Sequence, residues 1–238
     1  LPLTGYGLRY RFGLFKQSFV NGCQRENADD WTKYGDPWSH RRDKLAVKVK
    51  FADQTVNCVP YDMPVIGYET TTVGTLRLWQ CEAEEELNFD AFNAQDYVKA
   101  LEKKNKAEDI TRVLYPNDST WEGKRLRVKQ QYVLSSASLQ DILRDYRQEH
   151  GTDYYRLPEF IAVQLNDTHP AMSIPELIRL LMAEGLDFDA AFELTRRVFS
   201  YTNHTVMTEA LEKWDLELLR SVCLLYTSPS PRDKRQSR

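Results

Sequence analysis

Two short apolar segments, separated by two amphipathic helical segments, limit the fold of this chain more than any other feature. Residues 158–165 (PEFIAVQL) and 198–204 (VFSYTNH) have the length and apolar content of buried strands. Strands that alternate with helices are typical of α/β proteins. The last third of the chain is therefore predicted to be α/β, with the two strands separated by about one crossover unit.

The two helical segments carry their own start and stop signals. Ser173 and Glu176 have the spacing of a capping box, and Gly185 marks the end of the first helix. Asp187 or Asp189 is placed to cap the second helix, which continues through AAFELTRR. The first helix has an apolar stripe at helical spacing, formed by Ile174, Leu177, Ile178, Leu181 and Met182.

The first third of the chain is rich in strand patterns. Residues 7–20 have apolar side chains at alternate positions, a pattern that predicts a half-buried strand. Further strands are predicted over 44–51, 56–68 and 75–83. Residues 26–38 form a loop because Gly and Pro interrupt them.

Helices are predicted to dominate the middle of the chain. Asn93 is placed to cap a Lys-rich helix that continues to Ile110, and a helix with so polar a surface either projects, breaks or packs on a partner. Residues 115–125 read as a turn-rich loop. Residues 125–150 are predicted to form one long helix or a pair of helices.

Composition excludes several classes of protein. A net charge of −3 among 238 residues gives no electrostatic case for nucleic acid or an anionic membrane. The sequence has no apolar run long enough to span a bilayer and no secretory signal pattern. Its four cysteines read as free thiols, which favours the cytoplasm, and its four scattered histidines give little support to a metal site.

Polar side chains follow both strands of the last third. Asn166, Asp167 and His169 come after the first strand, and Asn203 and His204 come at the end of the second. If the strands are parallel neighbours, these groups converge on one edge, where ligands bind in open α/β sheets. Such a set of amides, a carboxylate and imidazoles suits a sugar pocket. The alternative is that the same groups satisfy loop backbone and helix termini.

Seven motifs occur in order along the chain, and together they resemble the α-glucan phosphorylase family over residues 5 to about 222. They are LRYRFGLFKQ, DDWTKYGDPW, YDMPVIGY, LRLWQ, RVLYPNDSTWEGKRLRVKQQY, QLNDTHPAMSIPELIRLL and SYTNHTVMTEALEKW. The resemblance implies a Rossmann-like N-terminal lobe of a two-lobed glycosyltransferase. It also implies pyridoxal phosphate as cofactor, and phosphorolysis of α-1,4-glucan by inorganic phosphate to glucose 1-phosphate with retained configuration.

The resemblance assigns roles to particular residues. His204 matches the histidine that contacts the reacting glucosyl unit, and residues 93–110 match a projecting helix that contacts the second subunit of a homodimer. The matching substrate-binding residues are Asp167 and His169 in the pocket, Asn117, Asp118 and Ser119 in a gate loop, and Arg127 just after that loop, where it can pair with the acid of the loop.

The chain departs from the family pattern at two places. Ser119 replaces an amide residue of the gate loop, which puts the sugar contact of that amide in doubt. Thr120 replaces an aromatic residue that is common in the family, which argues against a stacked purine-type inhibitor. Arg144 is followed by Asp145, where nucleotide-regulated members have two arginines, so activation by AMP is not expected.

Residues 1–222 are interpreted as an interior part of the N-terminal lobe, with the cofactor lysine outside the chain. Residues 223–238 have no periodicity, and CLLYTSPSPRD resembles the translation of a sequencing adapter; a natural disordered tail is the alternative. Two other functions stay open, namely a nucleotide-sugar glycosyltransferase of the same architecture and a non-catalytic glucan-binding module.

Overall fold

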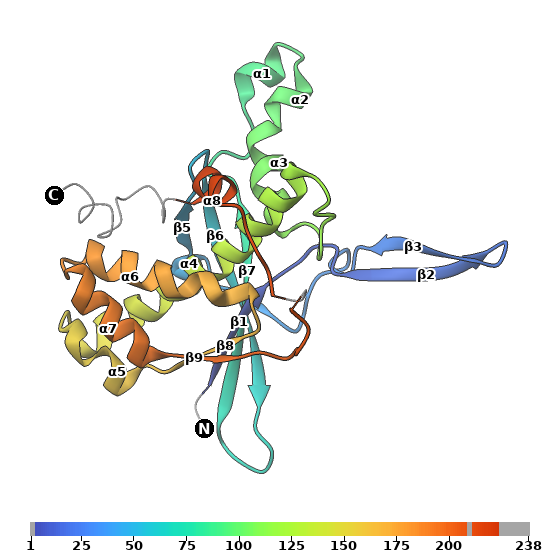
Figure 1. Cartoon of the computed structure of the whole chain (residues 1–238). Helices are drawn as coiled ribbons and strands as arrows, with labels where there is room; N and C mark the ends of the chain where they lie inside the picture. The colour runs from blue at the N-terminus through green and yellow to red at the C-terminus, as the bar shows by residue number, and fades with distance from the viewer. Residues whose placement is uncertain (1–2, 209–210, 224–238) are drawn as a thin grey trace. The chain divides into compact units, whose positions relative to one another are not determined.

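The computed structural model is a mixed α/β structure, as predicted, and it describes residues 3–208 and 211–223 (Figure 1). The described residues form two compact units: one contains the residues up to 48 together with 55–119, and the other contains 49–54 together with the chain from residue 120 onward. No helix in the described stretches is both long and apolar enough to cross a membrane. Of the tail predicted from residue 223, only Cys223 itself lies within the described residues.

A sheet with the strand order β1-β7-β6-β4 forms the centre of the first unit. β1 runs parallel to β7, whereas β6 runs antiparallel to both β7 and β4. The strands predicted over 56–68 and 75–83 are confirmed with small shifts at their ends. The strand predicted over 44–51 is confirmed in a shorter form, and it follows the 3-10 helix η1 (Asp43–Leu45). The strands are β1 (Thr4–Leu8), β4 (His40–Arg41), β6 (Thr55–Ile66) and β7 (Val73–Glu82), and β5 (Val47–Lys50) also pairs with β6.

The prediction of one strand over 7–20 was wrong, because β1 ends at Leu8 and the chain changes partner before it continues. The backbone N–H groups of Arg11 and Phe12 donate to the carbonyls of Thr111 and Arg112 at 3.1 and 2.8 Å. The alternating pattern therefore belongs to two elements that pair with different parts of the chain.

A separate hairpin follows, made of β2 (Leu14–Val20) and β3 (Cys23–Asp29), which extends away from the sheet of the first unit (Figure 1). Asn21 and Gly22 turn the chain with φ values of 53° and 77°, the left-handed conformation that an Asn-Gly hairpin turn requires. Because β3 extends to Asp29, the loop predicted over 26–38 is shorter at its start than expected.

The prediction of one helix from Asn93 to Ile110 was also wrong. Gln95 has a φ of 64°, which no helix can include, and the Asp96 side chain accepts the Lys99 N–H to cap a new helix. Asn88, rather than Asn93, caps the first piece through the Ala91 N–H. The segment consists of α1 (Phe89–Asn93), α2 (Tyr97–Ala100), α3 (Glu102–Glu108) and the 3-10 helix η2 (Asp109–Thr111).

One continuous helix, α4 (Trp121–His150), opens the main part of the second unit and resolves the choice between one helix and two. It begins inside the segment predicted as a loop over 115–125, because the Thr120 hydroxyl accepts the N–H of Gly123 and caps it. It ends at Gly151, whose φ of 78° suits glycine. The 3-10 helix η3 (Tyr154–Arg156) and the short helix α5 (Leu157–Phe160) follow.

The strands of the last third are confirmed in a shorter form as β8 (Val163–Asn166) and β9 (Phe199–Thr202), which pair in parallel. Pro158 lies in the first turn of α5 rather than in the strand, a position that suits proline. Between the strands lie the 3-10 helix η4 (His169–Met172), α6 (Ser173–Ala183) and α7 (Phe188–Val198). α8 (Leu216–Val222) is the last described helix.

Of the N-terminal caps predicted for α6 and α7, the two helices between β8 and β9, the cap of α7 is confirmed and that of α6 is wrong. Asp187 caps α7 by accepting the Ala190 N–H at 2.8 Å, and Gly185 follows α6 with a φ of 103°. The predicted capping box is wrong, since no side chain caps α6 and Glu176 is fully buried. Its carboxylate accepts hydrogen bonds from Tyr132, Ser136 and Arg179.

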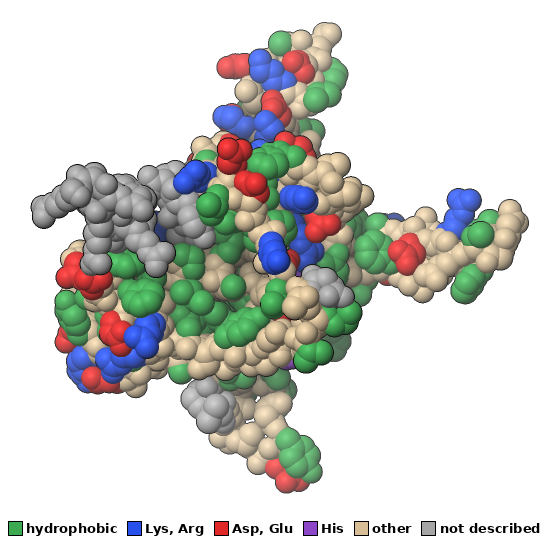
Figure 2. Space-filling view, viewed as in Figure 1, with side chains coloured by type: hydrophobic (Ala, Val, Ile, Leu, Met, Phe, Trp, Pro, Cys, Tyr) green, Lys and Arg blue, Asp and Glu red, His purple; other side chains and the backbone are tan. Residues whose placement is uncertain are grey.

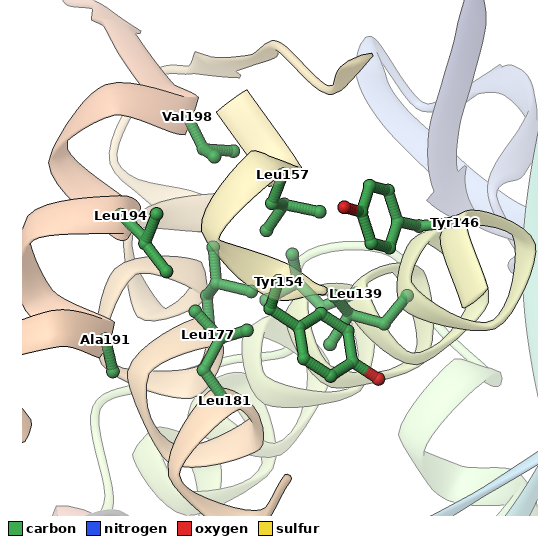
Figure 3. Close-up of a cluster of buried hydrophobic side chains, with 10 residues drawn as sticks. Leu139, Tyr146, Tyr154, Leu157, Leu177, Leu181, Ala191, Leu194 and Val198 are labelled. Atoms are coloured by element: carbon green, nitrogen blue, oxygen red, sulfur yellow. The ribbon is translucent and has the colours of Figure 1, made fainter. Parts of the chain in front are cut away.

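The apolar stripe of α6 packs into the core of the second unit. Leu177 and Leu181 point toward Leu157 of α5 and toward one face of α7, and Leu139 of α4 closes the cluster (Figure 3). The other members of this cluster are Leu143, Tyr146, Tyr154, Ala191, Leu194 and Val198. Burial of this cluster holds the crossover helices, and with them the ends of β8 and β9, in place.

Residues 49–54 belong to the second unit although they precede it in sequence by more than sixty residues. The Ala52 N–H donates to the Val222 carbonyl at 3.0 Å, and the ring of Phe51 lies 5.7 Å from that of Tyr132. The Asp53 carboxylate pairs with Lys129 at 2.9 Å. This segment therefore joins α4 to the end of α8.

Candidate functional site

The parallel pairing of β8 with β9 puts the predicted polar groups at one edge. Asn166 is the register partner of Thr202, so the residues after each strand leave the sheet side by side. His204 Nε2 contacts Asn166 Oδ1, and because an amide oxygen only accepts, Nε2 is the donor. The predicted convergence of the two strand ends is confirmed for these two side chains.

Asp167 sits in a conformation that the turn after β8 imposes. Its φ is 68°, and its N–H donates to the Thr202 carbonyl at 2.9 Å. Its carboxylate accepts the N–H of Thr168 at 2.9 Å. Asp is among the few residues that tolerate this backbone conformation. One carboxylate oxygen therefore serves the loop itself, which is the structural role weighed as the alternative from sequence.

His169 begins η4, and Arg127 reaches it from α4. The distance from Arg127 Nη2 to His169 Nε2 is 3.2 Å. A guanidinium has no acceptor, so Nε2 must accept this bond and the ring proton lies on Nδ1. The structure thus brings two of the predicted residues together and fixes the tautomer of the imidazole.

Glu212 connects this pair to the rest of the site, and the sequence patterns did not single it out. Its carboxylate accepts from Arg127 Nε and Nη2 at 3.2 and 2.9 Å, from Gln131 Nε2 at 3.0 and 2.9 Å, and from the Thr168 hydroxyl at 3.2 Å. Arg127 and Glu212 are each 17% exposed. No periodicity or spacing surrounds Glu212, so only the folded chain reveals its contacts.

We expect Glu212→Gln to lower the free energy of unfolding of this chain by about 1.5–3 kcal/mol, the usual contribution of hydrogen bonds to a charged group. It should also release the ring of His169 from the single Nδ1–H tautomer, because Arg127 loses its anionic partner. Urea unfolding and the ¹⁵N chemical shifts of the His169 ring measure the two effects. Glu159→Gln removes a carboxylate from an exposed pair with Arg156 and serves as the control; equal effects of the two variants would contradict the role of Glu212.

Asn117, Asp118 and Ser119, the predicted gate-loop residues, are the last residues of the first unit in sequence. They follow Tyr115, whose φ is 53°, and the Asn117 amide oxygen accepts the Ser119 N–H at 2.9 Å. The other predicted site residues, Arg127, Asp167, His169 and His204, belong to the second unit.

Comparison with known proteins bears directly on this set of residues. A family model described as carbohydrate phosphorylase matches residues 1–225 of the chain. The chain belongs to the carbohydrate phosphorylase family. The residues that converge after β8 and β9 are therefore part of a carbohydrate phosphorylase fold, and they lie within the matched range.

Curated relatives in this family are glycogen phosphorylases. The brain form and the liver form from Homo sapiens are each 44% identical over 244 aligned residues, and the muscle form from Oryctolagus cuniculus is 43% identical over the same length. Each alignment covers 93% of this chain but only 29% of the relative. The chain thus spans less than a third of the length of these phosphorylases.

Lys129 is the one buried lysine among the described residues, and its surroundings do not suit a cofactor carrier. Its Nζ lies 2.9 Å from Asp53 Oδ2 and 5.2 Å from the centroid of the Phe51 ring. Burial lowers the pKa of Lys129 and the Asp53 carboxylate opposes that effect. An aldehyde cofactor would have to displace both neighbours, so Lys129 is not assigned to hold pyridoxal phosphate.

Proposed function

We propose that the complete protein to which this chain belongs cleaves α-1,4-glucan at the non-reducing end with inorganic phosphate and releases glucose 1-phosphate. One observation supports the proposal most: the imidazole, amide and guanidinium groups expected to contact the sugar gather after β8 and β9 in a member of the carbohydrate phosphorylase family. The relatives that match it are named glycogen phosphorylases. We further propose that the second unit is part of a Rossmann-like lobe, and that the protein acts in the cytoplasm.

His204 is the proposed catalytic residue. With Nε2 donating to Asn166, its ring is held at the sheet edge, and in this proposal the ring and the backbone carbonyl face the glucosyl unit. A fixed dipole there stabilises positive charge as it develops on the sugar. Asp167 and His169 bind the sugar beside the reacting carbon, where His169 offers Nδ1–H as a donor.

The gate loop and the cofactor complete the proposal. Asn117, Asp118 and Ser119 bind substrate and close over it, and Arg127 lies at the start of the helix that follows them. Pyridoxal phosphate, when bound in the complete protein, supplies a phosphate group for proton transfer to the substrate phosphate. Its carrier lysine is proposed to lie outside these 238 residues.

Phosphate-dependent release of glucose 1-phosphate from glycogen or maltodextrin by the complete protein tests this function. The reaction without phosphate is the blank, and this chain alone is expected to release none. Sugar transfer that requires a nucleotide sugar and ignores phosphate would instead favour a glycosyltransferase. Glucan binding without either reaction would favour a binding module.

We also propose that the complete protein is a homodimer whose contact includes residues 93–110. Hydrophobic side chains lie exposed over α1 and α2 (Figure 2), among them Tyr97 at 57% and Val98 at 84% exposure. Projecting apolar side chains of this kind mark an interface.

Val98→Asp should therefore shift the complete protein from dimer to monomer in analytical ultracentrifugation. Tyr68→Asp, at an equally exposed residue (87%) in the turn after β6, is the matched control and should leave the dimer unchanged. A dimer that tolerates Val98→Asp as well as Tyr68→Asp would argue against this interface.

A further inference from the structure

Cys58 on β6 and Cys81 on β7 face each other in the middle of the first unit. They are direct register partners, and their Sγ atoms are 3.9 Å apart. Their exposed fractions are 0% and 1%, and both are free thiols. None of the proposed roles in glucan cleavage uses either residue.

The backbone places this pair in the closer of the two cross-strand arrangements. The Cys81 N–H donates to the Thr111 hydroxyl at 3.0 Å, so it points away from β6. The carbonyl of Trp79, two residues earlier, likewise accepts from the Arg9 N–H, on the β1 side of the strand. Cys58 and Cys81 are thus a non-hydrogen-bonded pair, for which Cα atoms lie about 4.5 Å apart. Disulfides need Cα atoms about 4.4–6.8 Å apart, so rotation of the two side chains is enough to close one.

Both thiols lie on a buried face of the sheet. Tyr61 and Gln80 alternate with them along β6 and β7, so these two side chains belong to the opposite face, where they line a cavity of about 480 Å³. Burial raises the pKa of Cys58, so this group stays a protonated thiol.

We propose that Cys58 and Cys81 form a modification site that hydrogen peroxide converts into a disulfide between β6 and β7. The sulfur of one thiol attacks one peroxide oxygen, the O–O bond breaks, and the departing hydroxide takes the thiol proton and leaves as water. The product is a sulfenic acid on that cysteine. The sulfur of the second thiol then attacks the first sulfur, the S–O bond breaks, and the hydroxide leaves with the second thiol's proton as a second water. The two thiols are oxidised by two electrons and the peroxide is reduced to two waters.

Peptide mapping of the oxidised chain tests the site. Trypsin cleaves after Lys50, Arg77 and Lys99, so Cys58 falls in peptide 51–77 and Cys81 in peptide 78–99. Folded chain treated with hydrogen peroxide, then alkylated, should give these two peptides joined, and reduction should separate them. The joined form should also unfold at a temperature several degrees higher, because the crosslink restricts the unfolded chain.

Single substitutions separate this site from nonspecific oxidation. Cys58→Ala and Cys81→Ala should each abolish the joined peptides. Cys23→Ala removes the exposed thiol and should leave the joined peptides unchanged. Recovery of Cys58 and Cys81 as alkylated free thiols while Cys23 is oxidised would overturn the proposal. So would joined peptides that form only when urea is present during oxidation.

Discussion

His204→Ala is expected to lower kcat/KM for phosphorolysis by about two to three decades in the complete protein, which corresponds to about 2–4 kcal/mol of barrier. The effect should fall mainly on kcat, because the charge that His204 faces appears only in the transition state. His204 is exposed and its ring contacts the exposed side chain of Asn166, so the fold should lose little stability.

Kinetics and the thermal midpoint of two variants distinguish catalysis from a structural role. His40→Ala is the control, since His40 is an exposed residue of β4 in the first unit. If His204 mainly satisfied the turn after β9, its removal would lower the thermal midpoint and leave turnover near normal in the folded fraction. Wild-type kinetics for His204→Ala would remove it from the site.

Glu176→Ala is expected to destabilise this chain by about 1.5–3 kcal/mol, because buried hydroxyl donors lose a charged acceptor, whereas Arg179 is partly exposed and can be solvated. The carboxylate accepts from Ser136 Oγ at 2.6 Å, from Tyr132 Oη at 3.2 Å and from both Arg179 nitrogens at 2.7 Å. Burial raises the pKa of Tyr132, so its hydroxyl stays a donor that would then lack this acceptor.

Urea denaturation measures this loss of stability. Glu193→Ala provides the comparison, because Glu193 also pairs with an arginine three residues along its helix, but in an exposed position. Such surface pairs contribute about 0–1 kcal/mol. Similar losses for Glu176→Ala and Glu193→Ala would contradict the role of Glu176 in joining α6 to α4.

Glu176 also shows where sequence interpretation reaches its limit. Its spacing after Ser173 matches a capping box, and that pattern depends only on neighbours within one helical turn. Its donors Tyr132 and Ser136 are about forty residues away in sequence, and burial against α4 turned the carboxylate inward. Glu212 was missed for the same reason, because its partners come from α4 and from the turn after β8.

Features that depend on local periodicity were predicted well. The strand-helix alternation of residues 158–204 identified β8, α6, α7 and β9, and parallel pairing then placed Asn166 beside His204. Local patterns failed where one residue left the common conformation, as at Gln95, whose positive φ divides the expected 93–110 helix. The motif resemblance supplied the family, which neither charge nor periodicity could have indicated.

The position of residues 49–54 has a consequence for how the protein is made. These residues leave the ribosome early, yet their partner Val222 is synthesised only after the whole first unit and all of α4 to α7. At typical elongation rates Ala52 waits about 10–30 s for that partner. During synthesis, the first unit can form its sheet while the second remains open at the end of α4. The pairing of residues 49–54 within the second unit therefore depends on the completion of α8.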